Sequence, residues 1–421
     1  MFLKNGISLT LFTSGKDSRG ENANENSGFT LQKMGWLPGE KIYHFIRKSF
    51  DRLKSRQRTG NAAPTANYFS IIKSEDKIPP FGLHNSVNRI NKWLHFLFVR
   101  LDNLLLIPYF LIFHRSKFAK AGLIVGYEVN YTFAAKALAR IFSKPYINKF
   151  QGVIIKASER DISVCRKYYP LFYFGINKAD LCLMVNDGTD GEYYARQRGC
   201  TNILFRPHGI NVADYAFSEE EMTTTLSRLG VPEDKFIVFN NASGSNWKRA
   251  DRCIRFLTHI PAHIRQHIMV ITTYHADDLE MLKSYTADLG LTSQVIFIER
   301  ANHKESNILI RGSHVVLMTN ELSNLGNPVL EAIYYKVPVI ATNDGSLDGF
   351  IESSKDGILL DLDANFDRRL AEEISRMYSE PAYYDGFRKQ IMENNSVKTI
   401  EEQQAIEFSH IEAVSDFSKP A

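Results

Sequence analysis

Short apolar runs rich in β-branched residues alternate with helix-like segments along almost the whole chain. The runs do not alternate apolar and polar residues, which is typical of strands that are covered on both faces of a sheet. We expect strands at Ile7–Thr13, Tyr68–Lys73, Leu123–Gly126, Tyr146–Phe150, Leu181–Val185, Ile203–Arg206, Phe236–Asn240, Met269–Thr272, Val295–Ile298, Val315–Met318, Val337–Ala341 and Ile358–Leu360. This alternation predicts an α/β protein with parallel sheets that have helices on both sides.

The predicted strands fall into two sets that join near residues 211–221. A chain of 421 residues is long enough for two or three domains of ~150 residues each. We therefore expect two Rossmann-like, doubly wound domains, residues 1–212 and 213–380, followed by helices in 381–421. Ligands of open α/β sheets bind at the carboxyl ends of the strands, so both sets of strand-end loops could line a cleft between the domains.

The net charge of +4 hides a strong asymmetry between the two halves. Residues 1–212 contain 31 Lys and Arg against 15 Asp and Glu, and the remainder contains 20 against 32, so the halves carry +16 and −12. Such a basic half favours an anionic partner. No zinc-finger, RNP or helix-turn-helix pattern supports nucleic acid. An anionic membrane surface or a lipid phosphate is the better candidate, and a basic surface without a partner is the alternative.

Cysteine usage and hydropathy favour a cytoplasmic protein. The four cysteines are scattered without a CxxC pair, as in a reduced protein without a zinc site, at Cys165, Cys182, Cys200 and Cys253. No stretch of 20 residues is free of charge, and the N-terminal apolar run is too short for a signal peptide.

Three segments between or within the predicted domains have distinctive compositions. Residues 14–39 are polar and rich in Gly and Asn, which predicts a mobile loop. Lys41–Arg58 has an apolar face and seven basic residues, which indicates either a peripheral membrane-surface helix or a helix packed on the sheet. Trp93–Phe113 is very apolar, but Arg100, Asp102 and Pro108 argue against a membrane span and favour a packed helix.

The most informative segment for function is residues 323–361. A small loop, Ser323–Asn327, precedes a short helix that we expect to begin near Pro328, because proline suits the first turn of a helix. Free N–H groups at a helix N-terminus bind anions, and we expect Glu331 in the first turn, where it can accept hydrogen bonds from hydroxyls. This combination suits a nucleotide diphosphate and its ribose. An ordinary helix-favouring carboxylate at Glu331 is the alternative.

This segment resembles the nucleotide-sugar site of retaining glycosyltransferases of family 4, the group 1 enzymes with the GT-B fold. Their pattern is E-G-F-G-L-P-V-L-E-A followed by G-x-P-V-I-A, and this chain has S-N-L-G-N-P-V-L-E-A and K-V-P-V-I-A-T. The resemblance implies that Glu331 holds the ribose and that Ser323 stands in the place of a catalytic Glu. It also implies that the donor is bound by the loop Asn324, Leu325, Gly326 and Asn327, and that a C-terminal helix crosses back to the first domain.

A second loop, after Phe236–Asn240, resembles the family's G-R-x-x-x-x-K-G. Lys248 matches the Lys that holds the diphosphate, and Ser243 stands in the place of the Arg. Gly244 of the same loop is a further donor contact, and Arg249, which stands where the family has Gly, is a second cation that we expect to help Lys248. A positioned cation stabilises the charge of a leaving diphosphate without a metal, so no metal and no cofactor is expected. A surface lysine early in a helix is the alternative for Lys248.

The first half resembles the family in four strand-end motifs, which implies contacts to the acceptor or sugar. The residues concerned are Glu128, Asn130, Gln151, Gly152, Asn186, Asp187, His208 and Gly209. The opening Phe2–Gly6 followed by Ile7–Thr13 matches the family's second strand, so the resemblance implies that the first strand and its glycine loop are missing.

The resemblance implies a hexosyltransferase that moves a sugar from a nucleotide diphosphate sugar to a saccharide or lipid-linked acceptor, with retention, in polysaccharide or glycoconjugate synthesis. We expect it in the cytoplasm or peripherally on the inner face of the membrane. A non-catalytic GT-B relative that binds or scaffolds is the alternative, because Ser323 and Ser243 depart from the family. A nucleotide-sugar epimerase with a two-domain cleft is a third reading.

Overall fold

The computed structural model describes residues 9–13, 29–33, 86–152, 162–212, 216–241, 248–274, 279–299, 301–320, 323–394 and 397–415. The predicted strand Tyr68–Lys73, the predicted helix Lys41–Arg58, and the donor contacts Ser243 and Gly244 lie outside these residues.

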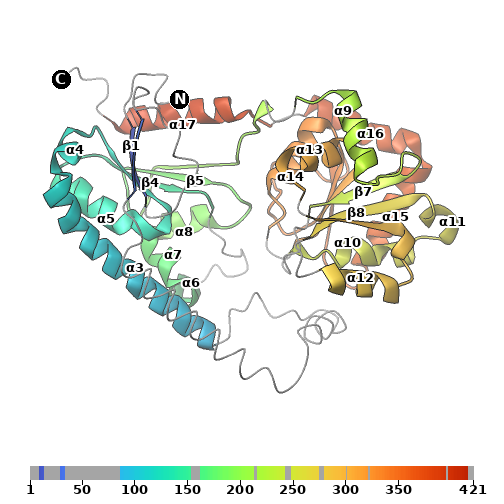
Figure 1. The fold of residues 1–421 in the computed structure, drawn as a ribbon, viewed down its shortest axis with the longest axis horizontal. Helices are drawn as coiled ribbons and strands as arrows, with labels where there is room; N and C mark the ends of the chain where they lie inside the picture. The colour runs from blue at the N-terminus through green and yellow to red at the C-terminus, as the bar shows by residue number, and fades with distance from the viewer. Residues whose placement is uncertain are drawn as a thin grey trace.

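The first lobe contains a four-stranded parallel sheet with the order β3-β4-β5-β6 (Figure 1). Its strands are β3 (Ile124–Tyr127), β4 (Tyr146–Phe150), β5 (Leu181–Val185) and β6 (Ile203–Arg206). Its helices are α3 (Ser86–Phe113), α4 (Arg115–Lys120), α5 (Glu128–Ile141), α6 (Ile162–Tyr168), α7 (Pro170–Gly175) and α8 (Gly191–Gln197).

The second lobe contains a six-stranded parallel sheet with the order β12-β11-β10-β7-β8-β9. Its strands are β7 (Phe236–Asn240), β8 (Ile268–Tyr274), β9 (Val295–Glu299), β10 (Val315–Met318), β11 (Val339–Thr342) and β12 (Gly357–Leu360). Its helices are α9 (Glu219–Arg228), α10 (Arg252–Arg255), α11 (Ala262–Arg265), α12 (Leu279–Asp288), α13 (His303–Arg311), α14 (Asn327–Tyr335), α15 (Phe366–Ser379) and α16 (Pro381–Glu393), with 3-10 turns at Phe256–His259 and Thr292–Gln294. The strand order reverses between β7 and β10, which is where open α/β sheets bind ligands.

The predicted α/β fold with two parallel sheets is confirmed, and the predicted strands of both sheets shift by at most two residues at an end. The largest shift at a strand start is in β11, which begins at Val339. Helix α14 ends at Tyr335, its C-cap Lys336 is left-handed (φ 62°), and Val337–Pro338 connects it to the strand. Both cores are apolar on each side of the sheet, as continuous apolar strands require.

The prediction of a structureless loop at residues 14–39 is wrong in one part. Within it, β2 (Phe29–Lys33) pairs in parallel with β1 (Leu9–Thr13) along five residue pairs. Phe29 and Leu31 alternate with polar residues, and this short pattern was outweighed by the surrounding Gly and Asn. The two strands form a sheet of their own in the described chain, and so β1 does not extend the β3–β6 sheet.

Of the two C-terminal helices, α16 packs on the second lobe and α17 (Ile400–Val414) crosses to the first (Figure 1). Phe387 of α16 belongs to the core of the second lobe. Glu407 of α17 forms ion pairs with Lys149 and with Arg206, the latter at 2.8 Å. A main-chain bridge between Ile210 and the start of α17 ties the two segments together.

We expect Thr399→Ala to lower the free energy of unfolding by about 1 kcal/mol, because the Thr399 hydroxyl caps α17 by accepting the N–H of Glu402 at 3.1 Å. Asn302→Ala, which removes the equivalent cap of α13 in the second lobe, is the matched comparison and should cost a similar amount. Urea denaturation of both variants checks this. Unchanged stability of Thr399→Ala would contradict the capping role.

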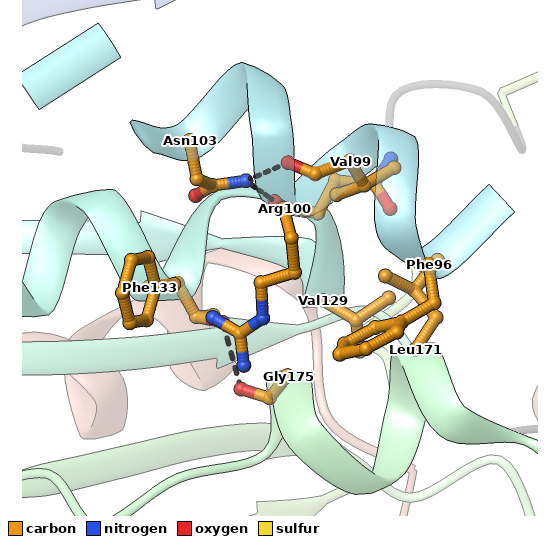
Figure 2. A pocket seen from close by; sticks show the side chains of 10 residues that line it. Phe96, Val99, Arg100, Asn103, Val129, Phe133, Leu171 and Gly175 are labelled. Atoms are coloured by element: carbon orange, nitrogen blue, oxygen red, sulfur yellow. Dashed lines mark hydrogen bonds between the residues drawn. The ribbon is translucent and has the colours of Figure 1, made fainter. Parts of the chain in front are cut away.

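Helix α3 is the one helix in the described part of the chain that is long and apolar enough, from Arg89 to Phe113, to cross a membrane by length and composition. As predicted, it is a packed helix: it packs mainly on α5 and α7, and its Leu106 and Phe110 belong to the same core cluster as Ile124 and Tyr146 of the sheet. Figure 2 shows its packed face, where Asn103 donates to the carbonyls of Val99 (2.6 Å) and Asn130 (2.7 Å). The pocket that remains there, about 10 Å³, has room for little more than a water molecule.

Candidate functional site

The loop Ser323–Asn327 follows β10 and is organised by a buried asparagine. The side chain of Asn324 donates to Thr342 Oγ1 at 2.6 Å and accepts the N–H of Asn320 at 2.9 Å. Its main-chain N–H donates to Ser346 Oγ at 2.8 Å. Asn324 therefore joins the ends of β10 and β11, and its side chain holds the loop in place instead of reaching outward.

Only part of this loop offers N–H groups to an anion, which corrects the expectation of an entirely free loop. The N–H of Leu325 donates to Ser323 Oγ at 3.2 Å, and that of Asn324 is taken by Ser346. Gly326, the N-cap of α14, and Asn327, its first residue, have no recorded partner for their N–H groups among the described residues. These two donors at the start of a nine-residue helix form the candidate anion site.

Glu331 lies in the second turn of α14, so the prediction that it lies in the first turn is wrong. The helix begins at Asn327, ahead of the proline, which makes Glu331 its fifth residue. The carboxylate is buried, and its Oε1 lies 3.3 Å from Nε2 of His303, whose own side chain is 53% exposed. The buried carboxylate of Glu331 therefore contacts a side chain that is itself partly exposed to solvent.

His303 was not recognised from the sequence. It is the first residue of α13 and follows β9, so it is 28 residues from Glu331 in the chain. Its position after a strand of a parallel sheet was the available signal. The same signal applies to Asn241, directly after β7, whose side chain accepts the hydroxyl of Thr273 near the end of β8 at 2.9 Å.

Lys248 lies beyond the carboxyl end of β7, the neighbour of β10, on the same side of the sheet as the loop Ser323–Asn327. Its Nζ donates to the carbonyl of Asn241 at 3.4 Å. Burial lowers the pKa of Lys248 below its usual 10.5, because desolvation disfavours the charged form. An anion bound at this amine would favour its charged form.

Arg249 does not support its predicted donor contact. Its guanidinium forms two hydrogen bonds, of 2.9 and 2.8 Å, with the carboxylate of Asp251, and both side chains are buried. Burial works against ionisation of Asp251, but the hydrogen bonds and charge of Arg249, together with the charges of Arg252 and Arg255, outweigh it and lower the pKa of Asp251. Arg249 also has a positive φ of 52°, which turns the chain sharply after Lys248.

In the first lobe, four predicted residues gather at the ends of adjacent strands. Glu128 accepts the N–H of Gln151 at 2.8 Å, and a Cβ added at Gly152 would lie 2.5 Å from Asp187 Oδ2. Burial raises the pKa of Glu128, and the Gln151 N–H acts in the opposite direction. Glu128 has a positive φ of 56°, a strained geometry that is common at functional sites.

His208, after β6, joins the same group. Burial and the charge of Arg206 lower the pKa of His208 from 6.5, and Asp187 opposes them. The imidazole is therefore mainly uncharged at neutral pH and can accept a hydrogen bond.

Three other residues that we expected on the acceptor side have contacts within the protein that shape the fold. Asn130 lies in the first turn of α5 and lines the small pocket under α3. Gly209 packs so closely on the start of α17 that a Cβ added there would lie 2.5 Å from the carbonyl oxygen of Thr399. Asn186 accepts the N–H of Gly188 at 2.9 Å and shapes the turn after β5.

The two lobes meet where the loops after β5 and β10 touch. The Ser323 hydroxyl donates to the carbonyl of Asp187. Gly188 has a φ of 77°, and a Cβ there would lie 2.4 Å from Ser323 Oγ and 2.6 Å from Ser346 Cβ. Ser323 therefore bridges the two lobes. The family that the segment resembles has a Glu at this position, and the described loop Ser323–Asn327 contains no acidic residue.

One family model matches most of the second lobe. The family model described as glycosyl transferases group 1 matches residues 222–396. A search of the curated proteins by sequence found no match.

Solved structures with the same fold cover both lobes. Anabaena HepE in complex with UDP-glucose is 18% identical, with a TM-score of 0.55 over 68% of this chain and 78% of that one. Sucrose-phosphate synthase from Thermosynechococcus elongatus is 18% identical, with a TM-score of 0.56 over 73% and 79%. A glycosyltransferase from Rickettsia africae is 13% identical, with a TM-score of 0.55 over 97% and 91%. At these identities the likenesses establish the fold.

Proposed function

We propose that this chain, a glycosyltransferase whose residues 222–396 belong to group 1, moves a sugar from a nucleotide diphosphate sugar to a hydroxyl acceptor. The observation that carries the proposal is the position of Glu331 and the α14 N-terminus. Both lie at the reversal of strand order and inside the matched region, and Lys248 follows the neighbouring strand β7 at the same end of the sheet. We further propose retention of configuration and no need for a metal, as in the family that the site resembles.

In this proposal the second lobe binds the donor. The N–H groups of Gly326 and Asn327 and the amine of Lys248 hold the diphosphate, because N–H groups at a helix N-terminus and a positioned cation both favour phosphate charge. Glu331, aligned by His303, accepts the ribose hydroxyls. HepE was solved with UDP-glucose, which makes uridine diphosphate sugars the first donors to test.

The first lobe holds the acceptor in this proposal, through Glu128, Gln151, Asp187 and His208. An acidic pair beside an uncharged imidazole suits the hydroxyl groups of a saccharide, free or linked to a lipid. The basic charge of this half favours an acceptor that carries phosphate and a site of action on the cytoplasmic surface of a membrane.

A non-catalytic relative remains the second candidate, because Ser323 is engaged with Asp187 where the family has an acidic residue. Incubating the purified chain with a panel of nucleotide sugars and measuring released nucleoside diphosphate, with and without added acceptors, distinguishes the two. We expect slow release of nucleoside diphosphate by hydrolysis when no acceptor is present, and faster release by sugar transfer when an acceptor is added. Binding without release would favour the non-catalytic relative, and interconversion of the free nucleotide sugar would favour an epimerase.

A further inference from the structure

Helix α3 has a continuous exposed apolar face that nothing in the described chain covers. Its exposed residues recur at helical spacing from Ile90 to Phe113, and include Leu97, Leu101, Leu104, Leu105 and Ile112. The fractions exposed are large: 55% for Leu97, 55% for Leu104 and 71% for Ile112. A contiguous apolar surface of this kind on one side of a helix indicates an interaction surface.

The opposite face of α3 fixes its orientation. Phe96, Val99, Leu106 and Phe110 are buried against the rest of the lobe, and Asn103 is anchored between α3 and α5. Asn103 also accepts the N–H of Ala134 at 3.0 Å. Because these bonds hold the helix on the lobe, α3 presents one side only. It lies along the outer edge of the first lobe (Figure 1), so it can lie flat on a surface but cannot cross one.

The charges around this face have one sign. The described residues of α3, α4, α6 and α7 contain a single carboxylate, Asp102, which is buried. Their basic residues are Arg89, Lys92, Arg100, Arg115, Lys117, Lys120, Arg166 and Lys167. The cations other than Arg100 lie at or beyond the two ends of the apolar face. This arrangement is complementary to a partner whose interior is apolar and whose outer layer is anionic.

A hollow at the N-terminal end of α3 adds a site for an anionic group. It has a volume of about 500 Å³ and lies between α3 and α6. Three cations line it, Arg89, Arg166 and Lys167, together with the aromatic rings of Trp93 and Tyr173. In the described chain neither Arg89 nor Arg166 forms an ion pair. Cations beside Trp and Tyr are typical of the headgroup layer of a bilayer.

We propose that the α3 face, defined as the exposed apolar side of α3 with the hollow at its N-terminal end, docks on an anionic lipid bilayer. The leucines and Ile112 enter the boundary between headgroups and acyl chains, and Arg89, Arg166 and Lys167 bind lipid phosphates. A 25-residue helix lying flat covers about 37 Å of membrane surface. The inference deepens the proposed function by naming the surface that meets the membrane, but docking itself requires no sugar transfer.

Flotation of the full-length chain with vesicles tests the apolar part. We expect binding to vesicles that contain ~30% phosphatidylserine and at least tenfold weaker binding for Leu97→Glu combined with Leu104→Glu, because each places a charge in the boundary layer. Leu362→Glu, at an equally exposed leucine of the second lobe, is the matched control and should bind normally. Thermal melting confirms that each variant is folded.

The cationic part is tested by Arg166→Ser and by salt. Each cation near an anionic surface contributes ~1 kcal/mol, so its removal should weaken binding about fivefold. Lys389→Ser on α16 is the control, and 0.5 M salt should release the protein. Three results would overturn the proposal: no vesicle binding, equal binding by the double Glu variant, or a protein dimer that the double Glu variant disrupts without any vesicle binding. A failure of sugar transfer would leave these readouts unchanged.

Discussion

Replacing Glu331 with alanine should reduce affinity for the nucleotide diphosphate sugar by about 100-fold, or ~3 kcal/mol. In the proposed site the carboxylate accepts two ribose hydroxyls, and hydrogen bonds to a charged group contribute ~1.5–3 kcal/mol each. The carboxylate is buried and already oriented by His303 at 3.3 Å, so little ordering cost accompanies binding. Titration calorimetry of the variant with the donor measures the change.

Two variants separate this role from a structural one. Glu331→Gln keeps the volume and one acceptor oxygen, so it should lose affinity by a smaller factor than alanine. Glu352→Ala removes an exposed carboxylate of the same lobe and should bind normally. Unchanged affinity in Glu331→Ala, with a normal melting temperature, would remove the residue from the donor site.

Replacing Lys248 with alanine should lower turnover by about 100-fold, the scale of losing one preorganised electrostatic contact to a developing charge. The amine is partly desolvated, which lowers its pKa, and the negative charge of a diphosphate leaving group would favour its charged form. Because the contact strengthens as the bond to the sugar breaks, kcat and kcat/KM should fall together.

Lys248→Met sharpens the experiment, because it keeps the apolar stem and removes only the cation. It should be as stable as the parent and as inactive as the alanine variant. Lys283→Ala, an exposed lysine on α12, is the matched control and should retain full turnover. A near-native rate for Lys248→Met would assign this lysine to the surface of the lobe.

The strands of both sheets were predictable because each is buried on both faces, and an apolar run bounded by turns is then a strong signal. Strand β2 was not, because its five residues lie among Gly and Asn and gain their order from pairing with β1. Long-range pairing of this kind overrides local composition.

The part of the candidate site that lies in one continuous segment was predictable. The part that depends on contacts between side chains far apart in the sequence was not. Residues 324–331 form the expected loop and helix, although the helix begins earlier than the proline suggests. The buried pair of Arg249 with Asp251 and the contact of Ser323 with Asp187 depend on three-dimensional packing, so the sequence assigned Arg249 to the donor. His303 was missed for the same reason.

The central claim is that the second lobe binds a nucleotide diphosphate sugar between the α14 N-terminus, Lys248 and Glu331. Isothermal titration of the full-length chain with uridine, guanosine, adenosine, cytidine and thymidine diphosphate sugars tests it most directly. We expect saturable heat with at least one of these compounds, and a large loss of that heat in Glu331→Ala. Absence of heat with every compound, for protein that melts cooperatively, would contradict it.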